Sequence, residues 1–182
     1  MAPPQYALVA YVKSPVGAFI ESLRREFHPT QAHLPAHITI LPPRILQGPE
    51  TEALETVGRV CRDVDPFEFV LGEVASFAPI TPTVFIRVAH AAYRMRELHD
   101  RLNVDPLHAE EQWPYMPHLT IFRMDTVERA VPALEEARHR WDDYRETRRV
   151  LMDHLTFVRQ AGANDWIDLA PVPLGRRLAA TL

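Results

Sequence analysis

The chain has 182 residues, of which 47% are hydrophobic and 24% are charged, and its formal net charge is −4. This length and hydrophobic content suffice for one domain, or for two small fused lobes, around a sizeable core. The acidic balance argues against a protein that coats long nucleic acids, because such proteins carry a surplus of Lys and Arg. We therefore expect any contact with nucleic acid to be short, such as a terminus or a single nucleotide.

The cysteine content, the N-terminal segment and the length of the apolar runs indicate the compartment and whether a membrane is contacted. Cys61 is the only cysteine, so an internal disulfide is excluded and a reducing compartment is expected. The N-terminus shows neither the basic nor the apolar segment of a secretory signal, and no apolar run approaches the roughly 18 residues of a membrane span. We expect a cytoplasmic protein without a membrane partner, and we take a monomer as the default oligomeric state.

The first half of the chain alternates strands with helices. Pro15 is typical of a first helical turn, and Pro42 and Pro43 remove backbone donors from the segment that follows residue 41. Apolar periodicity then sets the remaining elements. In order we expect strand 6–12, helix 15–28, strand 37–41, loop 41–49, helix 49–63 and strand 67–77.

The second half repeats this order. We expect strand 83–89, helix 91–103, a polar connection over 105–116, strand 118–122, helix 126–141, strand 150–158, a turn over 160–164 and a closing strand over 166–169. Thr126 is typical of a helix N-cap, whereas Pro132 indicates a later start or a kink. Corresponding elements are offset almost equally, because Tyr6 to Val84 is 78 residues and His37 to His118 is 81. The chain is therefore predicted to be one bilobal domain over 1–182, with unit one over about 6–78 and unit two over about 83–170.

Each unit contains one strand with the pattern His-x-Thr-x. The copies are His37-Ile38-Thr39-Ile40 and His118-Leu119-Thr120-Ile121, each close behind a proline. Alternate side chains of a strand share a face, so the His and Thr of each copy point one way and the aliphatic residues the other. Two similar units tend to pack around a pseudo-twofold axis. We expect such an axis to bring the two motif strands face to face at one cleft.

A third match, His154-Leu155-Thr156-Phe157, weakens the pattern as a signal on its own. It has no partner copy and follows no strand–helix pair. We interpret His154 as a peripheral strand histidine, and a secondary contact with the cleft stays open.

The paired motifs suit phosphoryl chemistry that needs no metal ion or other cofactor. An imidazole with an ordinary pKa of about 6.5 exists in both protonation states near neutral pH, so two of them can divide general acid and general base work. The hydroxyls of Thr39 and Thr120 can bind nonbridging oxygens, and Arg123 can offset charge on a pentacoordinate phosphorane. In a regular strand Arg123 would face away from His118, so the strand must bulge or end before it.

The motifs resemble the paired His-x-Thr-x signatures of the 2H phosphoesterase superfamily, which includes bacterial RNA 2',3'-cyclic phosphodiesterases also known as 2'-5' RNA ligases. His118-Leu119-Thr120-Ile121-Phe122-Arg123 is similar to the extended His-x-Thr-x-x-Arg form of the ligase-like branch. The first motif departs from that branch by running into Leu41-Pro42-Pro43-Arg44. The resemblance covers essentially the whole chain and implies an α+β fold. Its duplicated β-α-β-α-β units would form two pseudo-symmetric lobes with antiparallel sheets and a central cleft.

The resemblance also implies an activity in RNA processing, with an RNA terminus or a small nucleotide bearing a cyclic phosphate as the partner. A 2',3'-cyclic phosphate would open to a 2'-phosphate, with His118 activating water and His37 protonating the departing ribose 3' oxygen. Thr39 and Thr120 would bind the phosphate oxygens. Linear 2'-5' linkages, RNA 3' ends and a 2'-5' ligase side activity stay open.

Base stacking requires an aromatic side chain at the cleft. Tyr115 is the preferred candidate because it lies in a polar segment just before the second motif. The other candidates are Phe77, Trp113, Phe122 and Trp166. Arg44 and Arg159 are open candidates for binding a neighbouring phosphate.

Two further classes compete with this interpretation. A metal-dependent hydrolase could use His33 with His37, or His108 with Glu110 and Glu111, but Pro35 breaks the helix that would align the first pair. A non-catalytic module that binds an RNA end or a nucleotide is the other class. The intact state of both His/Thr pairs favours the enzyme.

Overall fold

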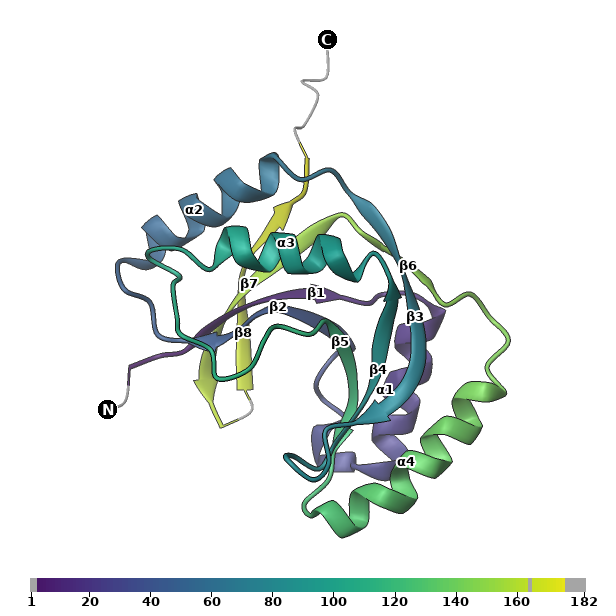
Figure 1. The fold of residues 1–182 in the computed structure, drawn as a ribbon. Coiled ribbons are helices and arrows are strands. Elements are labelled where there is room, and N and C mark those ends of the chain that lie inside the picture. Colours follow the sequence, from purple (N-terminus) through teal and green to yellow (C-terminus); the bar gives the residue numbers. More distant parts are fainter. Residues whose placement is uncertain (1–2, 164, 176–182) are drawn as a thin grey trace.

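The computed structural model describes residues 3–163 and 165–175. Figure 1 shows a curved sheet flanked by helices, which confirms the expected α+β class. The elements in chain order are β1 (Tyr6–Tyr11), α1 (Pro15–Phe27), the 3₁₀ turn η1 (Pro29–Gln31), β2 (His37–Arg44), α2 (Glu50–Arg62), β3 (Phe67–Ser76), β4 (Thr83–His90), α3 (Ala92–Leu102), β5 (His118–Arg123), α4 (Val127–Asp142), β6 (Arg149–Met152), β7 (His154–Gly162) and β8 (Asp165–Pro173).

The strands of the described residues form one eight-stranded sheet in the order β6-β3-β4-β5-β2-β1-β7-β8. Every pairing in it is antiparallel. The two halves of the sheet are pseudo-symmetric, because Tyr11 lies opposite His37 just as Arg87 lies opposite His118. They join where β2 meets β5, through the residue pair Ile38 and Leu119.

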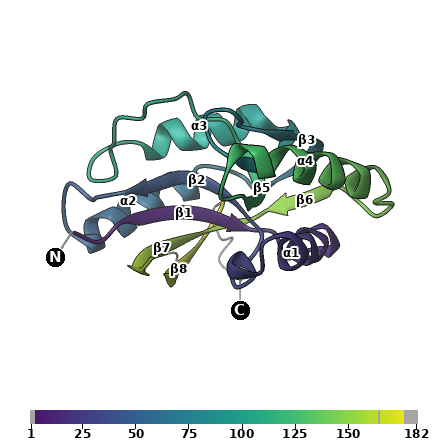
Figure 2. The ribbon, with the colours of Figure 1, turned by 90° about the horizontal axis from the view of Figure 1, so that it is seen from below.

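Each unit has strands that lie in the other unit's half of the sheet. Unit one supplies β3, which pairs with β4 of unit two, and unit two supplies β7, which pairs with β1. Figure 2 shows β7 and β8 beside β1, although they come from the end of the chain. Both units therefore contribute strands to each half of the one sheet.

One predicted strand was wrong because of this crossing. Residues 150–158 do not form a single strand; the chain divides at Asp153 into β6 and β7, which lie in opposite halves of the sheet. The sequence carries no Gly or Pro at the break, where only Asp153 and His154 separate two largely apolar stretches. The predicted turn over 160–164 is shorter in the structure, since β7 extends to Gly162 and β8 begins at Asp165; Asn164 lies outside the described residues.

The prolines after the first motif do not end its strand, contrary to the prediction of a loop from residue 41. Strand β2 continues through Pro42 and Pro43 to Arg44. The pairing with β1 changes register between its Tyr6 and Leu8, which lie opposite Arg44 and Leu41. Proline is tolerated at such irregular points because no ladder donor is needed there.

Helix α4 also passes through a proline. Thr126 caps it as predicted and accepts a hydrogen bond from the Arg129 backbone N–H at 3.3 Å, and the helix continues through Pro132. The later start that Pro132 indicated does not occur.

The main core lies between the helices and one face of the sheet. Motif residues Ile38, Ile40, Leu119 and Ile121 are fully buried there. They share one cluster with apolar side chains from all four described α-helices, among them Ile20, Val57, Leu98 and Ala137. None of the helices within residues 3–163 and 165–175 is long and apolar enough to cross a bilayer.

Candidate active site

The strand register places both motifs on one face of the sheet. Ile38 lies opposite Leu119 and both face the core, so the residues that flank them point to the other side. In an antiparallel pair this sets His37 beside Thr120 and Thr39 beside His118. We had expected the motif strands to lie face to face. They are instead neighbours in one sheet. The consequence for chemistry is the same, because two imidazoles and two hydroxyls share one surface.

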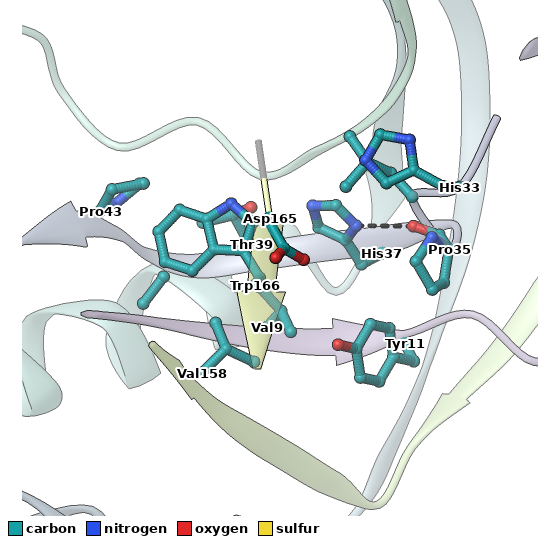
Figure 3. A pocket seen from close by; sticks show the side chains of 12 residues that line it. Val9, Tyr11, His33, Pro35, His37, Thr39, Pro43, Val158, Asp165 and Trp166 are labelled. Carbon is teal, nitrogen blue, oxygen red and sulfur yellow. Dashed lines mark hydrogen bonds between the residues drawn. The ribbon is translucent and has the colours of Figure 1, made fainter. Parts of the chain in front are cut away.

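The two histidines are held in the same way. His37 Nδ1 donates to the carbonyl of Pro35 at 2.8 Å, and His118 Nδ1 donates to the carbonyl of Met116 at 2.7 Å. Figure 3 shows the first of these bonds. A carbonyl oxygen can only accept, so Nδ1 must carry a hydrogen in both rings. This leaves Nε2 of each imidazole as the atom that can take up or release a proton.

Burial favours the neutral form of both histidines in the free protein. Burial lowers the pKa of His37, the bond to Pro35 partly opposes this, and the nearby charges of Arg24 and His118 lower it further. Burial likewise lowers the pKa of His118, against the opposing effect of its bond to Met116. A bound phosphate would act in the other direction, because an anion favours the imidazolium.

Aromatic rings pack against both histidines. His118 packs edge-on against Phe77 and Phe85, with ring centroids 5.0 and 5.2 Å away. His37 meets the ring of Tyr11 edge-on at 6.4 Å. Phe77, a candidate for base stacking, is thus placed beside a motif histidine and is stacked on Phe85 at 4.1 Å.

A bulge turns Arg123 toward the motif face. Thr120 lies opposite Phe85 and Phe122 opposite Val84, so β5 has one more residue than β4 between these pairs. Arg123, opposite Thr83, therefore lies on the same face as Thr120 and His118. The sequence required β5 to bulge or to end before Arg123, and the structure has the bulge, which is the condition for Arg123 to act on a phosphate.

Two side chains bind the backbone carbonyls of the motif threonines. The Tyr115 hydroxyl donates to the carbonyl of Thr39 at 2.8 Å. Arg24 of α1 donates from Nη2 to the carbonyl of Thr120 at 2.7 Å and from Nε to that of Ile121 at 2.8 Å, and it also donates to Leu34. Arg24 is only 3% exposed, and burial lowers its pKa. These contacts fix both motif strands from outside their own pairing.

Sequence reasoning missed Arg24. The signal was available, because Arg24 falls on the apolar stripe of α1, four residues after Ile20 and three before Phe27. A charged residue on such a stripe must find polar partners inside the protein. Its partners are backbone carbonyls, which no sequence pattern names.

The ring of Tyr115 also packs against the protein. The ring stacks on His99, with centroids 4.3 Å apart and planes within 2°. His99 Nε2 lies 3.1 Å from Glu111, which pairs with Arg44 at 2.6 Å. These contacts indicate a positioning role for Tyr115, and they bury Arg44 at 4% exposure, so Arg44 is not available to a phosphate.

The remaining candidates lie in different surroundings. Phe122 is fully buried in the core, Trp113 is 59% exposed, Arg159 pairs with Glu50 and His154 pairs with Asp153. Glu111 is held by Arg44 and His99, and no cluster of three or more His, Cys, Asp or Glu side chains suited to a metal ion occurs within the described residues.

A pocket of about 270 Å³ opens next to His37 (Figure 3). We call it the Trp166 pocket, and it is lined by Ala7, Val9, Tyr11, His33, Leu34, Pro35, His37, Thr39, Pro43, Val158, Asp165 and Trp166. Of the aromatic candidates for base stacking, Trp166 is the one that lines it. The pocket lies on the half of the sheet formed by β1, β2, β7 and β8.

Solved structures share this fold over nearly the whole chain. The crystal structure of LigT from E. coli complexed with 3'-AMP has a TM-score of 0.63 at 12% identity, covering 95% of this chain and 99% of that one. The crystal structure of TT0787 from Thermus thermophilus has a TM-score of 0.61 at 18% identity, covering 95% and 99%. At these identities the likeness concerns the fold alone.

Sequence comparison gives the family. A protein of Halalkalibacterium halodurans is 28% identical over 118 residues, which are 64% of this chain and 68% of that protein. One of Bacillus pumilus is 24% identical over 160 residues, which are 87% and 92% of the two chains. Both carry the name "Putative phosphoesterase". The family model described as the 2'-5' RNA ligase superfamily matches residues 12–164, which include both motifs. The chain therefore belongs to the 2'-5' RNA ligase superfamily, a group of 2H phosphoesterases.

Proposed function

We propose that the protein is a metal-independent phosphodiesterase, acting in the cytoplasm, that opens 2',3'-cyclic phosphate ends of RNA or nucleotides to 2'-phosphates. The observation that carries this proposal is the matched pair of imidazoles. Each is fixed through Nδ1 to a carbonyl two residues earlier, and each keeps Nε2 for proton transfer. Two such groups on one face can act on opposite sides of a phosphorus atom.

His118 and His37 have separate roles in this mechanism. Neutral His118 takes a proton from water as the water oxygen bonds to phosphorus. The bond from phosphorus to the ribose 3' oxygen breaks, and protonated His37 donates its proton to that oxygen. The step leaves a 2'-phosphate, neutral His37 and protonated His118, and exchange with solvent restores the starting states. The assignment follows the family resemblance of the two motifs.

The negative charge of a bound substrate favours the protonated form of His37, which the mechanism uses as the general acid. In the free protein the pKa of His37 is lowered, mainly by burial, so it begins neutral. The negative charge of a bound phosphate raises this pKa and favours the imidazolium that the mechanism needs. The surrounding low dielectric strengthens that interaction.

The neighbouring polar groups suit a phosphate ligand. Thr39 and Thr120 lie beside the opposite motif's histidine, where their hydroxyls can donate to nonbridging oxygens. Arg123 lies on the same face and is exposed, so it can approach the developing charge. Nucleotides are the expected ligand class, and E. coli LigT, a solved protein of the same fold, has been crystallised with 3'-AMP, ATP and NADP+.

The test is turnover of nucleoside 2',3'-cyclic phosphates, with the product identified by phosphorus NMR. His37→Ala and His118→Ala should each reduce kcat by about 100- to 10,000-fold, the usual contribution of a general acid or base. His154→Ala is the matched control, because His154 carries the same His-Leu-Thr pattern and pairs with Asp153 instead. Turnover near that of the wild type in the His37→Ala/His118→Ala double variant would contradict the mechanism.

The same experiment distinguishes the alternatives. Substrates with linear 2'-5' linkages and with plain RNA 3' ends belong in the panel, together with ligation of a 2',3'-cyclic phosphate to a 5'-hydroxyl. If one of these were turned over faster than the cyclic phosphate, it would be assigned as the substrate instead. Binding without any product would assign the protein to the non-catalytic class.

A further inference from the structure

We propose that the Trp166 pocket is the subsite for the nucleobase of the nucleotide whose phosphate is attacked. This inference rests on the proposed function and adds to it the position and recognition of the base. Its starting point is an apolar surface where an antiparallel sheet with one covered face usually shows polar side chains.

A small apolar cluster lies apart from the main core on the motif face. Ala7, Val9 and Val158 are at most 6% exposed, and Tyr11 and Trp166 pack against them. The strands pair Val9 with Thr39 and Tyr11 with His37, so the cluster begins next to the motif residues. No helix contributes to this cluster within the described residues. The rings of Tyr11 and Trp166 stay partly exposed, so an aromatic ligand can pack on them.

The pocket and the motif are continuous. His37 and Thr39 line it together with Trp166 and Val158, as Figure 3 shows. A nucleoside that carries a phosphate at the motifs would therefore reach the pocket directly. Stacking on an indole ring is the common way in which proteins hold an unpaired base.

The charge of the lining selects against a second phosphate. Of the described residues that line the pocket, none is Lys or Arg, and Asp165 contributes a carboxylate. Asp168, beside the pocket, accepts a 2.5 Å hydrogen bond from the Tyr11 hydroxyl. A carboxylate repels phosphate but accepts hydrogen bonds from the N–H groups of a base.

The other half of the motif face has the opposite character. Arg123 lies on it beyond Thr120, and Arg87 lies opposite His118, where it pairs with Glu73 at 3.0 Å. We infer that the terminal nucleoside occupies the Trp166 pocket and that the preceding phosphates of an RNA run toward β4 and β5. This direction of the RNA is inferred from the residues at equivalent positions of the two halves, since Tyr11 lies opposite His37 whereas Arg87 lies opposite His118.

The experiment compares binding of adenosine 2'-monophosphate with that of 1-deoxyribose 2-phosphate, which lacks the base, by isothermal titration calorimetry. The wild type should bind the nucleotide about 5- to 100-fold more tightly, the range expected for one stacked base. Trp166→Ala should lose this preference, and Trp166→Phe should retain most of it. Ile167→Ala is the matched control, because Ile167 is the next residue of β8, points to the other face and is 45% exposed.

Retention of the base preference in Trp166→Ala, or equal binding of both ligands by the wild type, would overturn the proposal. If circular dichroism shows that the alanine variant fails to fold, the comparison of the two ligands on the wild type still tests the proposal. Both ligands resemble products, so the measurement needs no turnover. A protein that keeps the base preference but hydrolyses nothing would refute the proposed function and leave the subsite standing.

Discussion

The Tyr115 hydroxyl donates a 2.8 Å hydrogen bond to the carbonyl of Thr39, so the segment that leads into the second motif holds the strand of the first. Arg24, from a helix of unit one, holds the carbonyl of Thr120 in the second motif. The motif strands pair through Ile38 and Leu119 where the two halves of the sheet meet. These two side chains therefore help to set the spacing between the motif strands.

Removal of the Tyr115 hydroxyl should affect catalysis more than binding. Tyr115→Phe keeps the ring on His99 but leaves the Thr39 carbonyl without its partner. We expect kcat to fall about tenfold or more, because small displacements of catalytic groups are costly, and the free energy of unfolding to fall by about 1 kcal/mol. Steady-state kinetics and urea unfolding measure both. Tyr93→Phe is the control, since Tyr93 is 67% exposed; equal behaviour of the two variants would refute a positioning role.

Replacement of Arg24 should change both stability and the titration of His37. Arg24→Met removes the donor of three backbone carbonyls, and we expect a loss of about 3 kcal/mol from the free energy of unfolding. The charge of Arg24 lowers the pKa of His37, so this pKa should rise in the variant.

NMR titration of the histidine ring signals checks the Arg24 prediction. Arg24→Lys keeps the charge without the planar fork, so it should preserve the pKa of His37 better than it preserves stability. Arg25→Met is the matched control, because the neighbouring Arg25 is exposed. An unchanged His37 titration in Arg24→Met would contradict the electrostatic link.

The lowered histidine pKa values predict an acidic optimum for kcat/KM, which reports the free enzyme. Both values lie below 6.5, so the fraction of enzyme with one protonated histidine falls as the pH rises above that value. We expect kcat/KM to decline from about pH 6.5 upward, while kcat persists to higher pH because bound phosphate raises the pKa of the acid. A kcat/KM that increases between pH 7 and 9 would contradict this.

The same shifts predict how stability depends on pH. The unfolded chain binds protons at these histidines at a higher pH than the folded protein does. Their contribution to stability is therefore present above pH 6.5 and is lost as the pH falls through the lowered values. Urea unfolding at pH 7.5 and 5.0 should show this loss, and it should be smaller in His37→Ala.

A good leaving group should separate the two histidines. Bis(4-nitrophenyl) phosphate expels a phenolate that needs little help from an acid. His37→Ala should therefore retain much more activity on this substrate than on a cyclic phosphate, whereas His118→Ala should remain impaired on both. The ratio of the two activities is the measurement, and a reversed ratio would exchange the acid and base roles.

Several features of the site could be predicted from the sequence because they are local. The alternation in each motif places His and Thr on one face. The position of Arg123 required β5 to end or to bulge, and β5 has the bulge. The remaining features depend on partners distant in the chain. Arg24 and Tyr115 bind backbone carbonyls 96 and 76 residues away, and no residue type marks such acceptors. Trp166 lines a pocket built by strands that the linear order separates.

The division of the predicted strand 150–158 into β6 and β7 also could not be predicted from hydrophobic periodicity. Only the polar pair Asp153 and His154 separates the two apolar stretches, without Gly or Pro, and the pairing with β3 and β1 divides them. The same holds for Pro42 and Pro43, whose place in β2 depends on the register with β1. Local propensity fixes which segments are strands more firmly than it fixes where they pair.

The exchange of strands between the two units has a consequence for how such a protein could have arisen. A single unit would lack a partner on one side of its first strand, because that place is filled by a strand of the other unit. An ancestral half-length chain could complete its sheet only by trading this strand with a second copy, as domain-swapped dimers do. Gene fusion would then have joined two halves that were already inseparable. Cleavage of today's chain between β3 and β4 should accordingly yield two fragments that remain bound and that do not fold apart.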